Sequence, residues 1–169
     1  NNCRFEKNFA GASGGAISMN FLDYEGLEPE QTVVANNSVF KSNIANGSKG
    51  GGAVFVERKS NSAKLKLLIL HSLLESNVAI EGSGGFALLK SATGDVRYCT
   101  FLNNRALEDG GSIAAQESKL AIFNSTLTSH NNESAYEVIK SDKAISLVNI
   151  QVQPVLGWKN HSIIAKCNS

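Results

Sequence analysis

The chain has 169 residues, enough for one domain, and its 16 basic and 15 acidic residues give a net charge of +1. This balance excludes a strongly basic nucleic-acid-binding protein, and no apolar run approaches the ~18 residues that a membrane-spanning helix needs. Ser, Asn and Gly contribute 20, 18 and 15 residues, and all three favour turns over helix interiors. We therefore expect many short strands. No charged and then apolar leader is present, so we expect any secretion signal to lie outside this sequence.

Two motifs alternate from the N-terminus to about residue 115. The first is an aromatic residue or Leu followed three residues later by Asn: Phe5 and Asn8, Phe40 and Asn43, Leu74 and Asn77, Phe101 and Asn104. The second begins with two glycines 9 to 11 residues further on: Gly14-Gly15-Ala16-Ile17, Gly51-Gly52-Ala53-Val54, Gly84-Gly85-Phe86-Ala87 and Gly110-Gly111-Ser112-Ile113. Four ordered pairs with so little scatter indicate an internal structural repeat.

Each repeat is predicted to contain three short strands. Apolar residues stand seven and five positions before the aromatic residue, as at Val33 and Ala35, whereas the next alternating pair is Ser38 and Phe40. This change of phase requires a bend, because alternation along one strand cannot skip a step. A third alternating segment follows each glycine pair and begins, in the first repeat, at Ile17.

The same alignment predicts two degenerate repeats centred on Leu127 and Val152. Three strands and three turns in about 25 residues are typical of one coil of a parallel β-helix. We therefore predict an all-β chain that forms one right-handed parallel β-helix of about six coils. It would be a single domain over residues 1–169, with clear repeats over 1–115 and degenerate coils over 116–169.

The repeated residues are expected to hold the coils together, since equivalent positions in successive coils lie ~4.8 Å apart. The glycine pairs should allow sharp turns. The aromatic residues of the first motif should be buried: Phe5, Phe40 and Phe101. The Asn residues of that motif should contact neighbouring coils from turns: Asn43, Asn77 and Asn104. A ladder of buried side chains is also expected three residues before the aromatic position: Asn2, Asn37, His71, Tyr98 and Asn124.

Three cysteines, Cys3, Cys99 and Cys167, fit no CxxC pattern and are expected to be small buried residues. Cys3 and Cys99 share a column but are three coils apart, roughly 14 Å at ~4.8 Å per coil. A disulfide needs Cα atoms within ~7 Å, so we expect no bond between them.

The first two repeats exceed the minimum coil by about ten residues each, over 20–32 and 57–66. Both surplus segments are expected to leave the same corner of adjacent coils. The first is acidic and the second basic, and loops on a rigid scaffold often carry binding residues. The candidate binding residues are Phe21, Asp23, Tyr24, Glu25, Arg58 and Lys59. The alternative is that both loops are tolerated insertions without a binding role.

The alternating motifs, with Asn-Cys or Asn-Ser just before the Phe, resemble the chlamydial polymorphic membrane proteins, and in particular their PmpD-type branch. The resemblance implies an autotransporter passenger segment, located at the bacterial outer membrane surface or secreted. Membrane contact would occur only through a barrel domain outside this sequence. It also implies adhesion to host epithelial cells through a surface receptor, with the epidermal growth factor receptor a candidate, and a homo-oligomer or fibre. Both motifs would be needed for adhesion, although Leu74 departs from the Phe of the family.

The main alternatives are a polysaccharide-acting β-helix enzyme and a purely structural spacer. An enzyme needs carboxylates that converge on one face, but Lys41 separates Glu6 from Glu75 in their shared column. Glu108 and Asp109 are an isolated acidic pair, and the three histidines, His71, His130 and His161, form no set with Ser and Asp. We therefore expect no enzyme activity, no cofactor and no metal.

Overall fold

The computed structural model describes residues 1–21, 31–58, 65–82, 86–106, 111–129, 139–141, 143 and 145–153. Over these ranges the chain forms 19 strands and no helix, so the prediction of an all-β chain is confirmed. The same ranges accordingly hold no helix that is long and apolar enough to cross a membrane.

The strands form three sheets in which every pairing is parallel. Sheet A contains β1 (Arg4–Glu6), β5 (Val39–Lys41), β9 (Leu73–Glu75), β13 (Thr100–Ala106), β16 (Thr126–Ser129) and β19 (Gln151–Gln153), with the short strands β2 (Phe9–Ala10), β6 (Ile44–Ala45) and β10 (Val78–Ala79) joined through β13. Sheet B contains β3 (Ile17–Phe21), β7 (Val54–Arg58), β11 (Ala87–Lys90), β14 (Ile113–Gln116) and β17 (Ile139–Ser141). Sheet C contains β4 (Gln31–Asn36), β8 (Leu65–Leu70), β12 (Thr93–Arg97), β15 (Lys119–Phe123) and β18 (Ile145–Val148).

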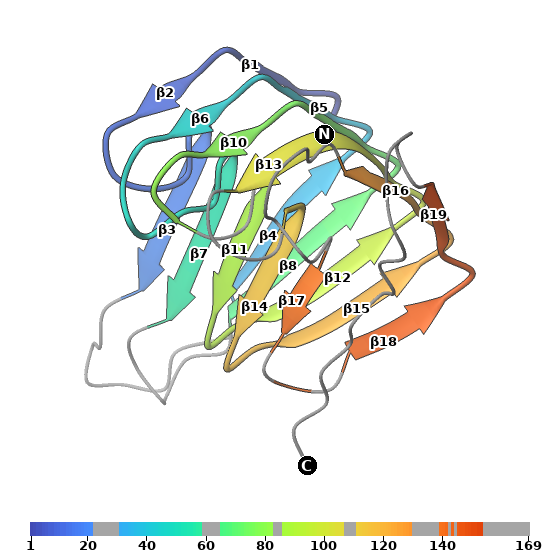
Figure 1. Ribbon diagram of the computed structural model, residues 1–169. Helices are drawn as coiled ribbons and strands as arrows, with labels where there is room; N and C mark the ends of the chain where they lie inside the picture. Colours follow the sequence, from blue (N-terminus) through green and yellow to red (C-terminus); the bar gives the residue numbers. More distant parts are fainter. Residues whose placement is uncertain are drawn as a thin grey trace, which may run out of the picture.

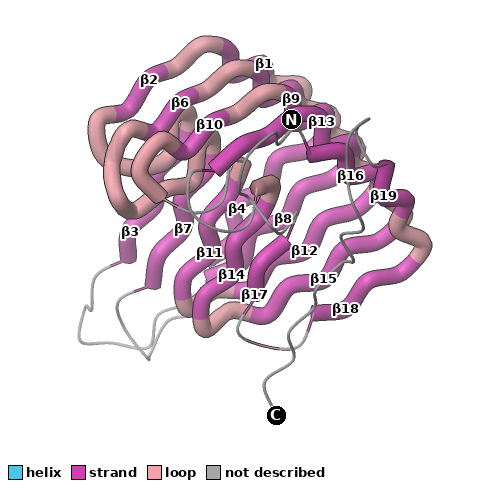
Figure 2. The backbone as a smooth tube through the Cα atoms, in the orientation of Figure 1, coloured by secondary structure: helices cyan, strands magenta, loops and turns pink. Residues whose placement is uncertain are grey.

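The chain visits the three sheets in turn, for example from β3 in sheet B to β4 in sheet C, to β5 and β6 in sheet A, and then to β7 in sheet B. Each circuit is one coil of a β-helix, and Figures 1 and 2 show successive coils side by side. Six equivalent strands, β1, β5, β9, β13, β16 and β19, follow one another in sheet A, which confirms about six coils. The right-handed sense of the coil stays a prediction, supported by the strong preference of parallel crossovers for that hand.

The register between coils is the one that the motifs predict. Successive partners in sheet A are the six anchor residues, Phe5, Phe40, Leu74, Phe101, Leu127 and Val152. In sheet B the residues after the glycine pairs are partners: Ile17, Val54, Ala87, Ile113 and, one coil further, Ile139. The degenerate repeats therefore continue the same columns as the clear ones.

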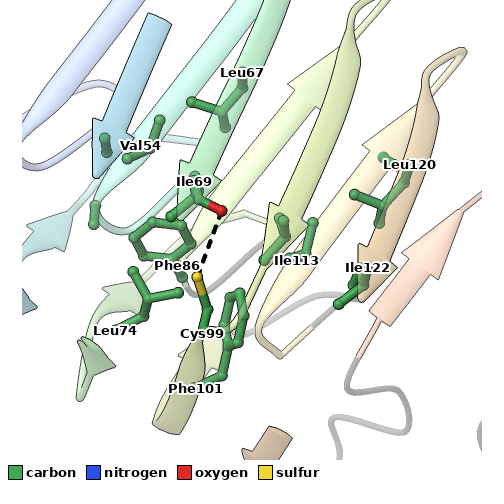
Figure 3. Packing of buried hydrophobic residues seen from close by; sticks show 14 of the residues in the cluster. Val54, Leu67, Ile69, Leu74, Phe86, Cys99, Phe101, Ile113, Leu120 and Ile122 are labelled. Atoms are coloured by element: carbon green, nitrogen blue, oxygen red, sulfur yellow. Dashed lines mark hydrogen bonds between the residues drawn. The ribbon is translucent and has the colours of Figure 1, made fainter. Parts of the chain in front are cut away.

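The core is a continuous column of apolar side chains inside the coils. Figure 3 shows residues of all three sheets meeting there, among them Ile69 from sheet C, Ile113 from sheet B and Phe101 from sheet A. Strand β8 illustrates the alternation, because Leu65, Leu67 and Ile69 are buried while the residues between them face outward. Burying apolar surface in this way is the main stabilising contribution.

The aromatic residues of the first motif fill one side of this column. Phe40 and Phe101 are fully buried, whereas Phe5 is only half-buried, contrary to expectation. Phe5 stacks on Phe40 with centroids 4.8 Å apart, but within the described ranges strand β1 has a neighbouring strand on one side only. In the third repeat Phe86 contacts Phe40 and Phe101 edge to face, at 5.3 and 5.7 Å, and so supplies the ring that Leu74 lacks.

The column three residues before the aromatic position is exposed, which corrects the prediction of a buried ladder there. Its members, Asn2, Asn37, His71, Tyr98 and Asn124, all have φ between 46° and 57°. This left-handed bend turns their side chains outward, where they still contact one another. Asn37 Nδ2 donates to Asn2 Oδ1 at 2.9 Å, and the His71 and Tyr98 rings stack at 4.9 Å.

Candidate functional site

The Asn residues of the first motif form a hydrogen-bonded ladder through four coils, exposed at Asn8 and buried at Asn43, Asn77 and Asn104. The backbone N–H and side-chain Nδ2 of Asn43 both donate to Asn77 Oδ1, at 3.1 and 2.9 Å. The same two groups of Asn77 donate to Asn104 Oδ1 at 3.0 and 2.9 Å, and those of Asn8 donate to Asn43 Oδ1. Nδ2 of each buried Asn also donates to the carbonyl of the preceding coil's aromatic position, as from Asn77 to Phe40 at 3.0 Å.

This ladder ends after the fourth coil. Asn104 Nδ2 still donates to the carbonyl of Leu74 at 2.8 Å, but in the fifth coil the hydroxyl of Thr128 takes the corresponding place and donates to the carbonyl of Phe101 at 2.8 Å. The register also shifts between Leu102 and Asn104, where β13 pairs with β16. His130, which the sequence places in this Asn position, lies outside the described residues.

A second ladder runs through the small residues two positions before the aromatic residue. The backbone N–H of Cys3, Ser38 and Cys99 donates to the hydroxyl of the next coil's Ser, that of Ser38, Ser72 and Ser125 respectively. Each of these hydroxyls in turn donates to the carbonyl two residues before it. Each Ser hydroxyl of this column therefore accepts a hydrogen bond from one coil and donates one within its own. Because small residues are also common in packed cores, the sequence alone does not distinguish this hydrogen-bonding role from simple packing.

The two described cysteines differ in exposure. Cys99 is buried as expected, and burial raises the pKa of its thiol to about 11. Cys3 is exposed, contrary to expectation, because it precedes β1, which within the described residues pairs with a strand on one side only. Both are free thiols, so the predicted absence of a bond between them is confirmed. Cys167 lies outside the described residues.

The glycine pairs act through backbone geometry. Gly14 and Gly51 have φ of 61° and 67°, and a Cβ at either would collide with the carbonyl oxygen three residues later, that of Ile17 or Val54. Gly15 packs against Gly52 in the next coil, where its N–H donates to the Gly52 carbonyl at 3.0 Å. Gly52, Ala53, Val54 and Gly111 are buried, and Ala16 and Ile17 are half-buried. Gly84, Gly85 and Gly110 lie outside the described residues.

The two surplus segments begin and end at matching positions of adjacent coils. Phe21 at the end of β3 is the partner of Arg58 at the end of β7, and β4 begins with Gln31 opposite Leu65 of β8. Four of the predicted loop residues lie outside the described part of the chain: Asp23, Tyr24, Glu25 and Lys59. The binding role of these loops therefore stays a prediction.

The acidic residues that bear on the enzyme alternative are paired with bases. Lys41 Nζ lies 2.9 Å from Glu75, and Arg4 Nε lies 2.7 Å from Glu6. The hydrogen bond from Arg4 lowers the pKa of Glu6. No group of three metal-binding side chains occurs among the described residues, and Glu108, Asp109 and His161 lie outside them.

Sequence reasoning missed a buried carboxylate beside sheet B. Glu57 is 4% exposed and lies 2.9 Å from Lys90 and 3.4 Å from Lys49. Burial raises the pKa of Glu57, but the hydrogen bond and charge of Lys90, with those of Lys49, outweigh it and leave the pKa below its usual value. Glu57 of β7 is thereby joined to Lys49 of its own coil and to Lys90 of β11 in the next coil. Their spacing in sequence, eight and 33 residues, gives no signal unless the coil register is known.

Most described motif residues thus lie inside the coils or at their bends. The side chains that a partner could contact are those that point outward from the coils. A family model described as the Chlamydia polymorphic membrane protein repeat matches residues 2–20 and 98–116. These segments contain the first and fourth copies of both motifs, which lie three coils apart in the structure. Searches of curated proteins and of solved structures each found no match. Two segments of the chain therefore match the repeat of the Chlamydia polymorphic membrane proteins, the family that its alternating motifs resemble.

Proposed function

We propose that this chain is an adhesive segment of a bacterial surface protein, which attaches to host epithelial cells through a receptor protein. The match of two segments to this repeat supports a surface-exposed protein of the autotransporter type, because that family consists of non-enzymatic, adhesin-type proteins. It also suggests a location at the outer membrane surface. Adhesion, the receptor and the PmpD-type branch are our proposals.

The observation that carries this proposal is that inward residues hold the coils together, whereas outward residues are positioned for contact with a partner. Asn43, Asn77 and Asn104 are 0% exposed and their amides bond to neighbouring coils. The repeats therefore build a rigid scaffold, and outward positions repeat at ~4.8 Å along it. Such a scaffold suits contact with a protein surface, because its contact residues are fixed before binding.

The motifs should support adhesion indirectly, through the fold. The test compares attachment of the fluorescently labelled 169-residue chain to intact epithelial cells with its melting temperature. Variants of Phe40 or Asn77 should lose attachment only in proportion to the fraction unfolded. A variant that lost attachment with an unchanged melting temperature would instead place that residue in direct receptor contact.

The epidermal growth factor receptor is the candidate partner, and its purified extracellular domain is the probe for it. We expect saturable binding of the folded chain to the immobilised domain, with the heat-unfolded chain as the control. Binding to cells without binding to this domain would retain adhesion and reject this receptor. No binding to either would favour the structural spacer, and cleavage products from a polysaccharide panel would favour the enzyme.

A further inference from the structure

The outward face of sheet C concentrates the exposed apolar side chains of the molecule. Among the described residues four large hydrophobic side chains are exposed, and three of them, Val34, Tyr98 and Val148, lie on this face or at its edge. They are 48%, 54% and 42% exposed. Leu70, Arg97, Phe123 and Val148 are successive partners in four strands, so they form one outward column. We call Val34, Leu70, Arg97, Tyr98, Phe123 and Val148 the sheet C patch.

The charges of this face are unevenly distributed. Arg97 is neutralised by two hydrogen bonds to Asp95, from Nε and Nη2, each 2.8 Å long. At the opposite edge, where the strands of sheet C begin, lie Lys66 and Lys119, and each is the partner of Thr93 between them. Lys143 reaches the same edge and donates from Nζ to the Glu117 carbonyl at 3.1 Å. Among the described residues of that corner Glu117 is the one acid beside three lysines, so these residues together carry a net positive charge.

A groove of about 540 Å³ lies at this basic edge, over β12, β15 and β18. Lys119 and Lys143 line it, and Gly94, Ala121 and Ser146 are among the small residues on its floor. Its surface is mostly apolar, which is typical of a site that receives a side chain. The apolar column, the basic edge and the groove therefore occupy one continuous face.

We propose that this face binds a segment of a protein partner that carries acidic residues next to apolar or aromatic ones. Tyr and Arg are enriched in the energetically important centres of protein interfaces. The basic edge complements acidic residues of the segment, and the groove and patch receive its apolar ones. This inference rests on the proposed function, for which it names the contact surface and the chemistry of the partner.

A sugar partner is less suited to the face, because one face of each of the two rings that could stack on a sugar is already covered. His71 covers one face of Tyr98, with the rings 4.9 Å apart and 2° from parallel. The guanidinium of Arg97 lies 5.0 Å from the centre of the Phe123 ring. These two rings therefore offer a sugar at most one open face each, besides their edges and the Tyr98 hydroxyl.

A second copy of this chain is also less suited. Five strands at ~4.8 Å and about six residues at ~3.3 Å give roughly 480 Å² for the face. A standard interface buries about 800 Å² on each partner, and two basic edges would repel each other. A single segment of a larger protein requires less area.

The test measures attachment of labelled chain to epithelial cells for matched variants. Tyr98→Asn combined with Val148→Thr removes exposed apolar surface while keeping residues that suit the local backbone, since Asn occupies the Tyr98 column in other coils. We expect attachment to weaken at least about tenfold with an unchanged melting temperature. Phe9→Thr is the control, because Phe9 is 64% exposed but lies on sheet A, and it should change attachment less than twofold. Lys66→Glu with Lys119→Glu should slow association and reduce its dependence on salt.

The outcomes separate this inference from the proposed function. If the wild-type chain attaches and the sheet C variants attach equally well, the patch is wrong and adhesion stands. If attachment survives trypsin treatment of the cells but not glycosidase treatment, the partner is a glycan and the inference is overturned. If the wild-type chain does not attach at all, the proposed function fails.

A second measurement tests the face without cells. Selection from a displayed random-peptide library on the immobilised chain should enrich acidic, aromatic peptides that bind wild-type protein and the Phe9→Thr control. They should bind Tyr98→Asn/Val148→Thr at least about tenfold more weakly. If no enriched peptide depends on the patch, the inference is overturned whatever the adhesion result.

Discussion

At the scale of single residues, Asn77 shows how one side chain can connect three coils. It accepts from Asn43, donates to Asn104 and donates to the carbonyl of Phe40, all without exposure to water. Asp could not reproduce this pattern, because a carboxylate has no N–H groups to donate. The motif position therefore requires an amide, which combines a donor and an acceptor.

Replacing Asn77 by Ala should destabilise the chain by about 2 to 4 kcal/mol. The backbone N–H of Asn43 would lose its acceptor and the Phe40 carbonyl one donor, and each unsatisfied buried group costs about 1 to 3 kcal/mol. Urea unfolding followed by circular dichroism measures the change. Asn46→Ala is the matched control, because this exposed Asn makes no side-chain hydrogen bond within the described part of the chain, and it should change stability by less than about 0.5 kcal/mol. Equal losses in both variants would contradict the ladder.

Phe86 and Leu74 should be coupled. Phe86→Ala alone should cost about 3 to 5 kcal/mol by leaving a cavity, and Leu74→Phe alone about 1 to 3 kcal/mol by overpacking. The double variant restores the Phe and Ala that the first two repeats have at these positions, so it should be more stable than the sum of the single changes by at least about 1 kcal/mol. A double-mutant cycle in urea measures this term. Additive losses would mean that the ring at residue 86 does not occupy the space beside Leu74.

Cys99 should make stability fall at high pH. Its folded pKa of about 11 exceeds the ordinary value of 9.0, so the unfolded thiol ionises first as pH rises. The stabilisation is fully present below about pH 9 and is lost as pH rises through 11, by at most about 2 to 3 kcal/mol. Cys99→Ser is the control, because Ser occupies this column at Ser38, Ser72 and Ser125. The wild-type chain should lose stability relative to this variant between pH 9 and 11, and parallel pH profiles would contradict the assignment.

At the scale of elements, the turn before sheet B depends on a left-handed backbone and on a close approach that leaves no room for a Cβ at Gly51. Gly51→Ala should destabilise the chain by at least about 2 kcal/mol, because φ is positive there and the Cβ would collide with the Val54 carbonyl. Gly11→Ala is the control, since a Cβ at Gly11 meets nothing within 4 Å, and it should be neutral or slightly stabilising. Thermal unfolding compares the two. Similar melting temperatures would mean that this turn can rearrange.

The sequence predicts the elements and their register well for a physical reason. In a β-helix the partner of Phe40 is the residue with the same role in the next coil, so repetition in sequence reports pairing in space. Repetition in sequence does not report the direction in which a side chain points at a bend. The change of phase at Asn37 predicts a bend, but alternation does not say that its left-handed backbone turns the side chain outward.

The sheet C patch could not be predicted by the same reasoning. Its column contains Leu70, Arg97, Phe123 and Val148, in which no residue type recurs, so the column forms no motif. Only Tyr98 gave a signal, as an aromatic residue in a column that holds Asn in four of the clear or degenerate repeats, at Asn2, Asn37, Asn124 and Asn149. Residues that build the scaffold repeat, whereas residues that recognise a partner need not.

At the scale of the whole molecule, unpaired strand edges determine how separate copies of the chain associate. Within the described residues β1, β2, β3 and β4 bound one end of the sheets, β17, β18 and β19 bound the other, and each pairs with a strand on one side only. Unpaired strand edges are templates for another chain, and a net charge of +1 opposes association only weakly. Stacking of one end on the other does not close, so it produces a series of sizes.

We therefore expect the 169-residue chain to self-associate, with a mass that rises continuously with concentration in size-exclusion chromatography with light scattering. Backbone pairing at the edges is insensitive to side chains on the faces, so Tyr98→Asn/Val148→Thr should leave this rise unchanged. A variant that abolished the rise would instead assign association to the sheet C patch, and a single discrete dimer would point to a closed, two-fold contact. A constant monomer mass at the highest concentration would mean that the edges are covered, because exposed parallel strands with so little net charge have no other protection against pairing.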